Sequence, residues 1–155
     1  MIQKSDDILE FKNDFERFSN FYPVVIHYKR RSFPSVEHAF VSEKSNDSVF
    51  KNRIANLKES QVGKAKRLGR KIKLREDWDQ VKDQVMMELL LIKFNYPEFK
   101  NLLLSTGDCL IKEGNYWHDN YWGDCTCKKC ENIIGQNKLG VMIMKIRKEL
   151  ACQKF

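Results

Sequence analysis

The segment WDQVKDQVMMELLLIKFN, residues Trp78–Asn95, is the clearest structural signal in the sequence. Its apolar side chains recur at intervals of three and four residues: Trp78, Val81, Val85, Leu89 and Ile92. Such spacing places them in one stripe along an α-helix. Pro97 follows, and proline does not continue a helix. We therefore predict a long amphipathic helix whose apolar stripe faces a core.

Shorter helical patterns lie on both sides of this segment. Ser35 is a suitable N-cap for one of them, and Gly69 suits the left-handed residue that ends another. Asn137 is a possible cap for the last helix, in which Leu139, Met142, Ile146 and Leu150 face inward. The predicted ranges are 35–44, 49–57, 60–69, 98–104 and 139–150.

The β structure is predicted to be small and close to the N-terminus. Val24–Tyr28 is β-branched and aromatic, and Lys29-Arg30-Arg31 can turn the chain into a second short strand. The sequence therefore predicts an α-rich α+β fold, mostly helical. At 155 residues the chain is expected to form a single domain over residues 1–155.

Composition restricts the location and the class of protein. Apolar residues make up 42% and charged residues 32%, and no apolar run approaches the roughly 20 residues that cross a bilayer. The N-terminal MIQKSDDILEF carries acids where a secretory signal has a basic region. We expect a cytoplasmic protein with no membrane partner. Its five cysteines are then thiols or metal ligands rather than a disulfide framework.

Positive charge is concentrated in one stretch of the chain. Net charge is +7, and KAKRLGRKIKLR, from Lys64 to Arg75, holds seven cations and no acid. The stretch is either a solvated helix face or a docking strip for phosphates of a nucleic acid or a pyrophosphate-bearing ligand.

Two opposite charges in the predicted helix 35–44 form a candidate site. Glu37 and Lys44 are seven residues apart, so they share a helix face and lie roughly 10 Å apart along its axis. They are either two surface residues or two groups that flank a ligand.

The segment GNYWHDNYWGD, Gly114–Asp124, has an unusual density of aromatic and acidic residues. Its rings can stack on a base, and an aspartate can bind ribose hydroxyls or orient water. Trp117 and Trp122 can equally fill a core beneath a long loop. The same region holds His118, Cys125, Cys127 and Cys130, whose donor atoms suit zinc, although their spacing is compressed. Whether they bind zinc stays open.

Several motifs together resemble the NADAR (NAD- and ADP-ribose-associated, or YbiA-like) family from about Phe15 to Leu150. They include Ser19-Asn20-Phe21, Pro34-Ser35-Val36-Glu37-His38, Lys44, Gly69-Arg70, Trp78, Val85-Met86, Lys93-Phe94, Leu103-Leu104, Thr106-Gly107, Asp119-Asn120-Tyr121-Trp122-Gly123, Gly135-Gln136-Asn137-Lys138-Leu139-Gly140, and Met144 with Arg147. The cysteine-rich segment before Gly135 departs from the family, which commonly has a glycine-rich stretch there.

The resemblance implies an N-glycosidase of EC 3.2.2 type. The implied substrate is an ADP-ribosylated guanine base or a related ribosylated base, presented by a nucleic acid or a nucleotide-like small molecule. Early riboflavin-pathway intermediates are the alternative substrate, and a non-catalytic ADP-ribose or nucleic-acid reader is the alternative function. No cofactor and no catalytic metal are implied. Oligomeric state stays open.

The resemblance also implies roles for individual residues. Glu37, Lys44 and Asp119 form the predicted catalytic set, and whether Lys44 forms a covalent imine stays open. The predicted substrate-binding residues are Asn20, Phe21, His38, Arg70, Trp122, Gly123, Asn137 and Arg147.

Overall fold

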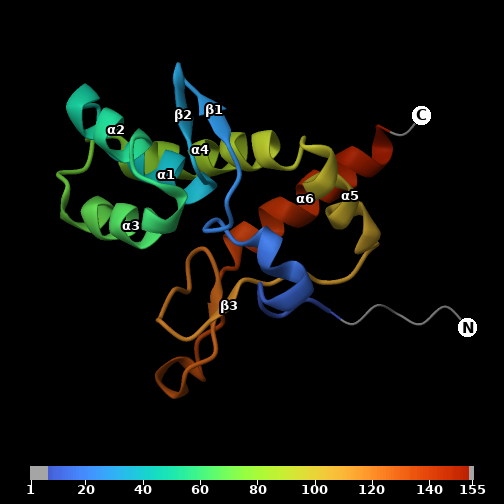
Figure 1. The fold of residues 1–155 in the computed structure, drawn as a ribbon. Coiled ribbons are helices and arrows are strands. Elements are labelled where there is room, and N and C mark those ends of the chain that lie inside the picture. The colour runs from blue at the N-terminus through green and yellow to red at the C-terminus, as the bar shows by residue number, and fades with distance from the viewer. Residues whose placement is uncertain (1–6, 154–155) are drawn as a thin grey trace, which may run out of the picture. The chain divides into compact units, whose positions relative to one another are not determined.

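The computed structural model describes residues 7–153, and their contacts divide the chain into two compact units. Unit 1 contains the residues up to Ser19 and those from Tyr96 onward, and unit 2 is Asn20–Asn95. Helices dominate and the strands are short (Figure 1), so the predicted α-rich α+β class is confirmed. The prediction of a single domain over residues 1–155 stays a prediction.

Unit 2 begins with a β-hairpin. Strands β1 (Ile26–Tyr28) and β2 (Arg31–Phe33) pair antiparallel, with Tyr28 opposite Arg31. Lys29 and Arg30 connect the strands with φ of 46° and 68°, a left-handed pair that matches the twist of a two-residue hairpin. The predicted second strand and its turn are therefore confirmed.

Four helices complete unit 2: α1 (Val36–Ser42), α2 (Ser48–Ala55), α3 (Val62–Lys71) and α4 (Trp78–Lys93), with a 3₁₀ turn at Glu59–Gln61. The central helix is α1, which contacts α2, α3, α4 and both strands (Figure 1). Ser35 caps α1 as predicted, because its side chain accepts a hydrogen bond from the His38 N–H at 3.2 Å.

The predicted long helix corresponds to α4. Trp78, Val85 and Leu89 are buried, and the Trp78 ring lies 5.0 Å from that of Phe40 in α1. The stripe therefore faces the core, as its spacing predicted. The burial of Lys93 near the end of the helix was not predicted.

Gly69 does not end its helix, contrary to the prediction. α3 continues to Lys71, and Gly69 is not in the left-handed region. A Cβ at this position would lie 2.9 Å from Cγ1 of Val41 in α1. The glycine therefore serves close helix packing rather than helix termination.

Unit 1 contains the 3₁₀ helix η1 (Asn13–Phe18), helix α5 (Pro97–Ser105) and helix α6 (Lys138–Cys152), and α5 packs on α6. In α6 the inward positions Leu139, Ile146 and Leu150 are buried as predicted, but Ile143 is buried where Met142 was expected. Between α5 and α6 the chain forms only β3 (Gly114–Asn115), its parallel partner β4 (Asp124–Cys125), and η3 (Lys128–Cys130).

Asn137 precedes α6, but its side chain does not cap the helix as predicted. Its backbone is left-handed, with φ of 49°. The side-chain oxygen accepts a hydrogen bond from the Glu113 N–H at 3.0 Å, and the amide nitrogen donates to the Ile111 carbonyl at 2.9 Å. Asn137 thus ties the start of α6 to residues 111–113.

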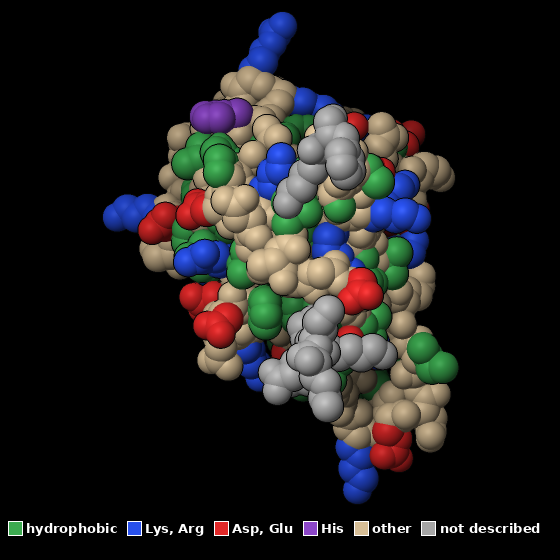
Figure 2. All heavy atoms as spheres, turned by 90° about the vertical axis from the view of Figure 1, so that its right-hand side faces the viewer, with side chains coloured by type: hydrophobic (Ala, Val, Ile, Leu, Met, Phe, Trp, Pro, Cys, Tyr) green, Lys and Arg blue, Asp and Glu red, His purple; other side chains and the backbone are tan. Residues whose placement is uncertain are grey.

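Within residues 7–153, each helix is too short or too polar to cross a bilayer. The predicted absence of a secretory signal concerns in part residues 1–6, which lie outside the described residues. On the face drawn in Figure 2, cationic and acidic side chains are interspersed rather than gathered by sign.

Candidate active site

Glu37 lies in the first turn of α1, and Lys44 lies two residues beyond Ser42, where α1 ends; both side chains are half-buried. The helix is therefore shorter than the predicted range 35–44, and the two residues do not share a face of it. Burial lowers the pKa of the Lys44 amine; the Glu37 carboxylate raises it, and the cations Lys66 and Arg70 lower it. The net direction is below the ordinary value for lysine. Unit 2 therefore brings Glu37, Lys44 and Arg70 into one electrostatic group, and their catalytic and binding roles stay predictions.

The backbone at Lys44 is held from two sides. Its N–H donates to the Val41 carbonyl at 3.1 Å, and its carbonyl accepts from the Arg75 N–H at 2.8 Å. Cδ of Lys44 would lie 3.5 Å from a Cβ at Gly69, so the alkyl chain rests against α3 where that helix has no side chain. The Lys44 amine lies 5.9 Å from the centroid of the Phe40 ring. The position of the amine thus follows from helix packing.

Glu43, next to Lys44, is the centre of an ion-pair cluster that was not predicted from the sequence. Its side chain is 3% exposed and meets Lys51 at 2.9 Å, Lys29 at 3.0 Å and Arg75 at 3.6 Å. Burial raises the pKa of the Glu43 carboxyl, but the hydrogen bonds from Lys51 and Lys29 lower it by more. The net pKa lies below the ordinary value, so the carboxyl stays ionised. The cations come from a turn, a helix and a loop, and no local pattern marks the position.

Asn20 and Phe21 stand at the start of α1. The Asn20 carbonyl accepts the Glu37 N–H at 3.1 Å, and its amide nitrogen lies 3.6 Å from the Met86 sulfur. Its side-chain oxygen is buried and has no hydrogen-bond partner among residues 7–153. Phe21 is 37% exposed, with the Lys66 amine 5.3 Å from its ring centroid. Asn20 therefore contacts the backbone of Glu37, and Phe21 lies next to Lys66 of α3.

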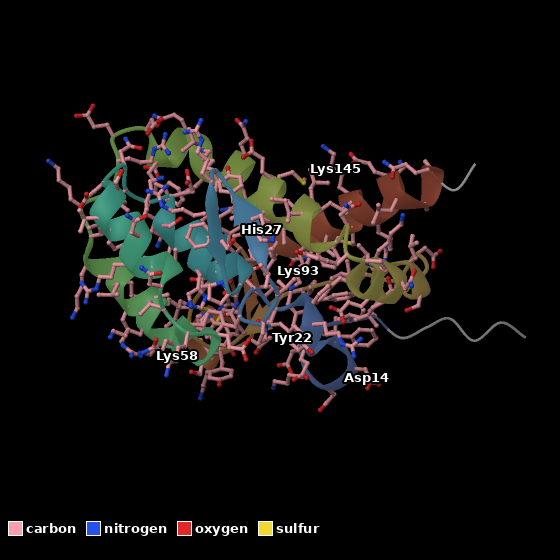
Figure 3. All side chains as sticks on the ribbon, turned by 45° about the horizontal axis from the view of Figure 1, so that its top comes forward. Asp14, Tyr22, His27, Lys58, Lys93 and Lys145 are labelled. Carbon is pink, nitrogen blue, oxygen red and sulfur yellow. The ribbon has the colours of Figure 1, made fainter. Side chains whose placement is uncertain are left out.

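His38 is fully buried rather than placed at a rim. Its Nδ1 lies 2.6 Å from the Ser35 hydroxyl and its Nε2 lies 3.2 Å from the carbonyl of Lys58, which Figure 3 labels. Burial lowers the pKa of this imidazole, so the ring favours its neutral form. These contacts favour a structural role, and substrate binding by His38 stays a prediction.

Asp119 and Trp122 belong to unit 1. Oδ1 of Asp119 accepts hydrogen bonds from the Tyr121 N–H at 3.1 Å and the Trp122 N–H at 2.9 Å, while Oδ2 takes no part in these two bonds. Trp122 is half-buried, and its ring lies 4.9 Å from that of Tyr121 in an edge contact. Trp117 is 48% exposed, which excludes the core role considered for it.

The remaining predicted binding residues of unit 1 are engaged within the protein. A Cβ at Gly123 would lie 2.3 Å from the Glu113 carbonyl oxygen, so only glycine fits. Asn137 holds residues 111–113, as described above. Arg147 donates to the Thr106 hydroxyl and to the Cys109 carbonyl, both at 2.9 Å. For Asn137 and Arg147 these bonds favour structural roles, and ligand binding stays a prediction.

Lys93 is a second residue that the sequence reading missed. It is fully buried in α4 (labelled in Figure 3), with its amine 5.7 Å from the Phe94 ring centroid. Burial lowers its pKa to about 7. The sequence contained one indication of this burial: Lys93 follows Leu89 by four residues, so both lie on the same helix face.

Comparison with known proteins places the chain in a family. The model of the NADAR domain matches residues 9–151. The chain belongs to the NADAR domain family, as its motifs predicted.

Individual relatives support this assignment. N-glycosidase YbiA of Escherichia coli (strain K12) is 33% identical over 153 residues, which cover 96% of this chain and 92% of that protein. The NMR structure of the E. coli protein YbiA matches with a TM-score of 0.81, over 99% of this chain and 91% of that one. N-glycosidase Npun_R5314 of Nostoc punctiforme is 37% identical, over 86% of this chain and 84% of that protein.

A plant relative has a different name. The chloroplastic riboflavin biosynthesis protein PYRR of Zea mays is 30% identical over 88% of this chain, but the match covers only 23% of that longer protein. The names of the bacterial relatives confirm the predicted enzyme class, a hydrolase of N-glycosyl bonds. They do not name the base or the sugar.

Proposed function

We propose that this chain hydrolyses the C1′–N bond of an ADP-ribosylated guanine base, or of a related ribosylated base. The observation that supports the proposal is the electrostatic interaction of Glu37, in the first turn of α1, with Lys44, just after the end of α1; both side chains are half-buried, and burial lowers the pKa of the amine. A carboxylate and a less basic amine that interact electrostatically are groups that can act on one sugar carbon.

Glu37 acts on the charge that develops during the reaction. Cleavage of the C1′–N bond builds positive charge on the sugar, in an oxocarbenium-like transition state. A carboxylate next to the ring stabilises that charge and can remove a proton from the attacking water. The Glu37 N–H is fixed by the Asn20 carbonyl, which holds the start of α1 in place.

Lys44 offers a covalent route. Its neutral amine attacks C1′ while the bond from C1′ to the base nitrogen breaks, and the base leaves with a proton. Opening of the sugar ring then gives an imine, which water hydrolyses to release the sugar and restore the amine. Partial burial favours this route, because it raises the fraction of neutral amine.

The cations of α3 suit the phosphates of such a substrate. Arg70 is exposed, Lys66 is half-buried, and both interact with Lys44. The guanidinium of Arg70 presents a fork of donors to a phosphate. This supports a nucleic acid or a nucleotide-like molecule as the partner. Asp119 is proposed as a second acid or base, and Trp122 as a stacking surface for the base.

A riboflavin-pathway intermediate is the second candidate substrate. The specific observation in its favour is the similarity to the maize protein, which is named for riboflavin biosynthesis. A ribosylaminopyrimidine phosphate also has a C1′–N bond and a phosphate, so the same residues would act on it.

The test compares two substrates and two variants. The protein is incubated separately with an ADP-ribosylated guanine oligonucleotide and with a ribosylaminopyrimidine phosphate, and the products are identified by mass spectrometry. Glu37→Gln should lower base release by about 10³-fold with folding intact. Glu59→Gln removes an exposed acid of the same unit and should change nothing.

Unchanged turnover in Glu37→Gln would exclude the proposed role of Glu37. Tight, salt-dependent binding of the oligonucleotide without any product would instead support the non-catalytic reader. Sodium borohydride added during turnover should trap a sugar adduct on Lys44. A trapped adduct supports the covalent route, and a proven turnover without one supports direct attack by water.

A further inference from the structure

Four side chains with metal-binding atoms converge in the loop between α5 and α6. They are the imidazole of His118 and the thiols of Cys125, Cys127 and Cys130, and their ligand atoms all lie within 4.8 Å of one another. His118 Nδ1 lies 3.3 Å from the Cys127 sulfur and 3.4 Å from the Cys130 sulfur. All four residues belong to unit 1.

These separations suit one tetrahedral ion. With zinc–sulfur bonds of about 2.3 Å and zinc–nitrogen bonds of about 2.0 Å, tetrahedral geometry places two sulfurs about 3.8 Å apart and a nitrogen about 3.5 Å from a sulfur. The two measured nitrogen–sulfur distances lie close to the latter value. We propose that His118, Cys125, Cys127 and Cys130 bind one Zn²⁺ ion, through the imidazole Nδ1 and three thiolates.

The backbone brings the four ligands together from separate turns. His118 follows β3 and adopts a left-handed φ of 69°, which is uncommon for a residue with a side chain. Cys125 ends β4, while Cys127 immediately precedes the short η3 and Cys130 is its last residue. The compressed spacing that argued against zinc in the sequence is therefore compatible with a site, because β3, β4 and η3 bring the four ligands together.

Two of the sulfurs have N–H groups of the protein next to them. The His118 N–H lies 3.3 Å from the Cys125 sulfur, and the Asn120 amide nitrogen lies 3.4 Å from the Cys130 sulfur. The Asn120 oxygen accepts from the Cys125 N–H at 2.9 Å, which orients this amide. Such outer hydrogen bonds to ligating atoms are a regular feature of metal sites.

The donor set favours a structural zinc ion over other cations. Thiolates with one imidazole are soft ligands, which disfavours Mg²⁺ and Ca²⁺. Three thiolates and Zn²⁺ leave one net negative charge, and the exposed Lys128 and Lys129 lie within the same segment. Four protein ligands fill a tetrahedral zinc ion, so this site is closed and does not supply a metal-bound water. A disulfide between two of the thiols would give no role to the imidazole.

The zinc ion would hold the loop that carries Asp119 and Trp122. His118 directly precedes Asp119, and Cys125 follows Trp122 by three residues, so two ligands bracket this segment. The ion would fix both ends of the segment without touching a substrate. This inference does not depend on the proposed reaction.

Metal content of the full chain is the direct test. Protein is prepared with zinc and a thiol reductant, desalted, and measured by elemental mass spectrometry. We expect about one equivalent of zinc per chain, since structural zinc sites are normally filled. Cys152→Ser, which removes an exposed thiol outside the cluster, should retain that equivalent.

Two variants locate the ion. Cys127→Ser and His118→Asn replace the two ligands that are not buried, so they disturb packing least. Each should lower bound zinc at least about tenfold in competition with a metallochromic chelator, because each removes one of four ligands. Zinc content equal to that of Cys152→Ser in both variants would overturn the proposal.

Cobalt gives a measurement that needs no variant. Co²⁺ added to the metal-free, reduced protein should produce the absorption bands of a tetrahedral thiolate complex, and Zn²⁺ should abolish them. Less than about a tenth of an equivalent of zinc, together with the absence of these bands, would refute the site.

Discussion

The two segments that carry the predicted catalytic residues are held in place by different physical means. Glu37 and Lys44 are placed by packing, because α1 is buried among the other elements of unit 2. Asp119 is placed by polar side chains: it accepts from Tyr121 and Trp122, and Asn115 binds its backbone. The first arrangement should be sensitive to side-chain volume where helices touch, and the second to the loss of single hydrogen bonds.

The largest expected effect concerns Lys44. Lys44→Ala should lower kcat/KM by about 10³-fold, equivalent to about 4 kcal/mol. If the amine attacks, wild-type kcat/KM should rise with pH until it levels off at the pKa of Lys44, which lies below the ordinary lysine value. Lys44→Arg keeps the charge but has no nucleophilic amine, so it should not restore activity. A fully active Lys44→Arg variant would exclude nucleophilic attack by Lys44 and leave this residue only an electrostatic role.

Glu43→Gln should have the largest effect on stability. It removes the carboxylate that Lys29, Lys51 and Arg75 share, and the expected loss is about 3 kcal/mol in free energy of unfolding by urea. Because the folded-state pKa of Glu43 is lowered, its stabilisation is complete above the unfolded value and is lost as the pH falls through the folded value. Glu59→Gln is the control. Equal free energies of unfolding for Glu43→Gln and Glu59→Gln would contradict the stabilising role of Glu43.

Asn115→Ala tests the polar arrangement of the loop. The Asn115 side chain is buried, donates to the Asp119 carbonyl at 2.8 Å, and accepts from the N–H groups of Trp117 and Asp119 at 3.2 Å. Removal should cost about 2 kcal/mol in the free energy of unfolding. Hydrogen exchange should increase in residues 115–125 and not in α1. Asn132→Ala, at an exposed position of the same loop, should be neutral.

Lys93→Met should stabilise the protein, by about 1–2 kcal/mol at pH 7. The folded-state pKa of Lys93 is lowered to about 7, so the unfolded chain binds more protons between that value and the ordinary lysine range. Wild-type stability should therefore rise from pH 7 to pH 10, and Lys93→Met should lose this rise. Urea denaturation of both proteins at several pH values measures this rise. The same slope of stability against pH in wild type and Lys93→Met would contradict the prediction.

The smallest expected change in stability follows Gly69→Ala. Alanine improves helix propensity by about 1 kcal/mol but places a methyl group 2.9 Å from Val41 Cγ1. The two effects oppose each other, so thermal unfolding should change little. The methyl group meets Cδ of Lys44 only at an ordinary contact distance of 3.5 Å, so activity should also change little. Gly63→Ala is the control, since a Cβ there meets only the flexible end of Arg67 at 3.5 Å.

These two segments also differ in what their sequence revealed. The helices of unit 2 could be predicted from the sequence, because apolar spacing, a serine cap and a proline are local signals. Glu37 and Lys44 were selected with the help of family motifs, although Lys44 lies beyond the end of the helix on which both were placed. Glu43 and Lys93 were missed, because their environments are made by residues distant in the sequence. Gly69 was misread, because a glycine required by a neighbouring helix resembles one that ends a helix.

For the loop between α5 and α6, only the amino-acid composition could be interpreted. Its density of aromatic, acidic and thiol side chains marked it as functional, but no periodicity predicted which side chains meet. Asn137 illustrates the difficulty: it has the residue type and position of a helix cap, yet its amide serves residues 111–113. Convergence of His118 with the three cysteines likewise depends on turns that spacing alone did not indicate.

The side-chain oxygen of Asn20, buried and without a hydrogen-bond partner among residues 7–153, offers a route to the natural substrate that needs no enzymatic assay. A buried acceptor gains a hydrogen bond only when a compound brings a donor to it. In a panel of nucleosides and sugar phosphates, those with an amino or hydroxyl group at the right position should raise the melting temperature most. Their counterparts methylated at that group should not, so the pattern of shifts would reveal which face of the ligand meets α1.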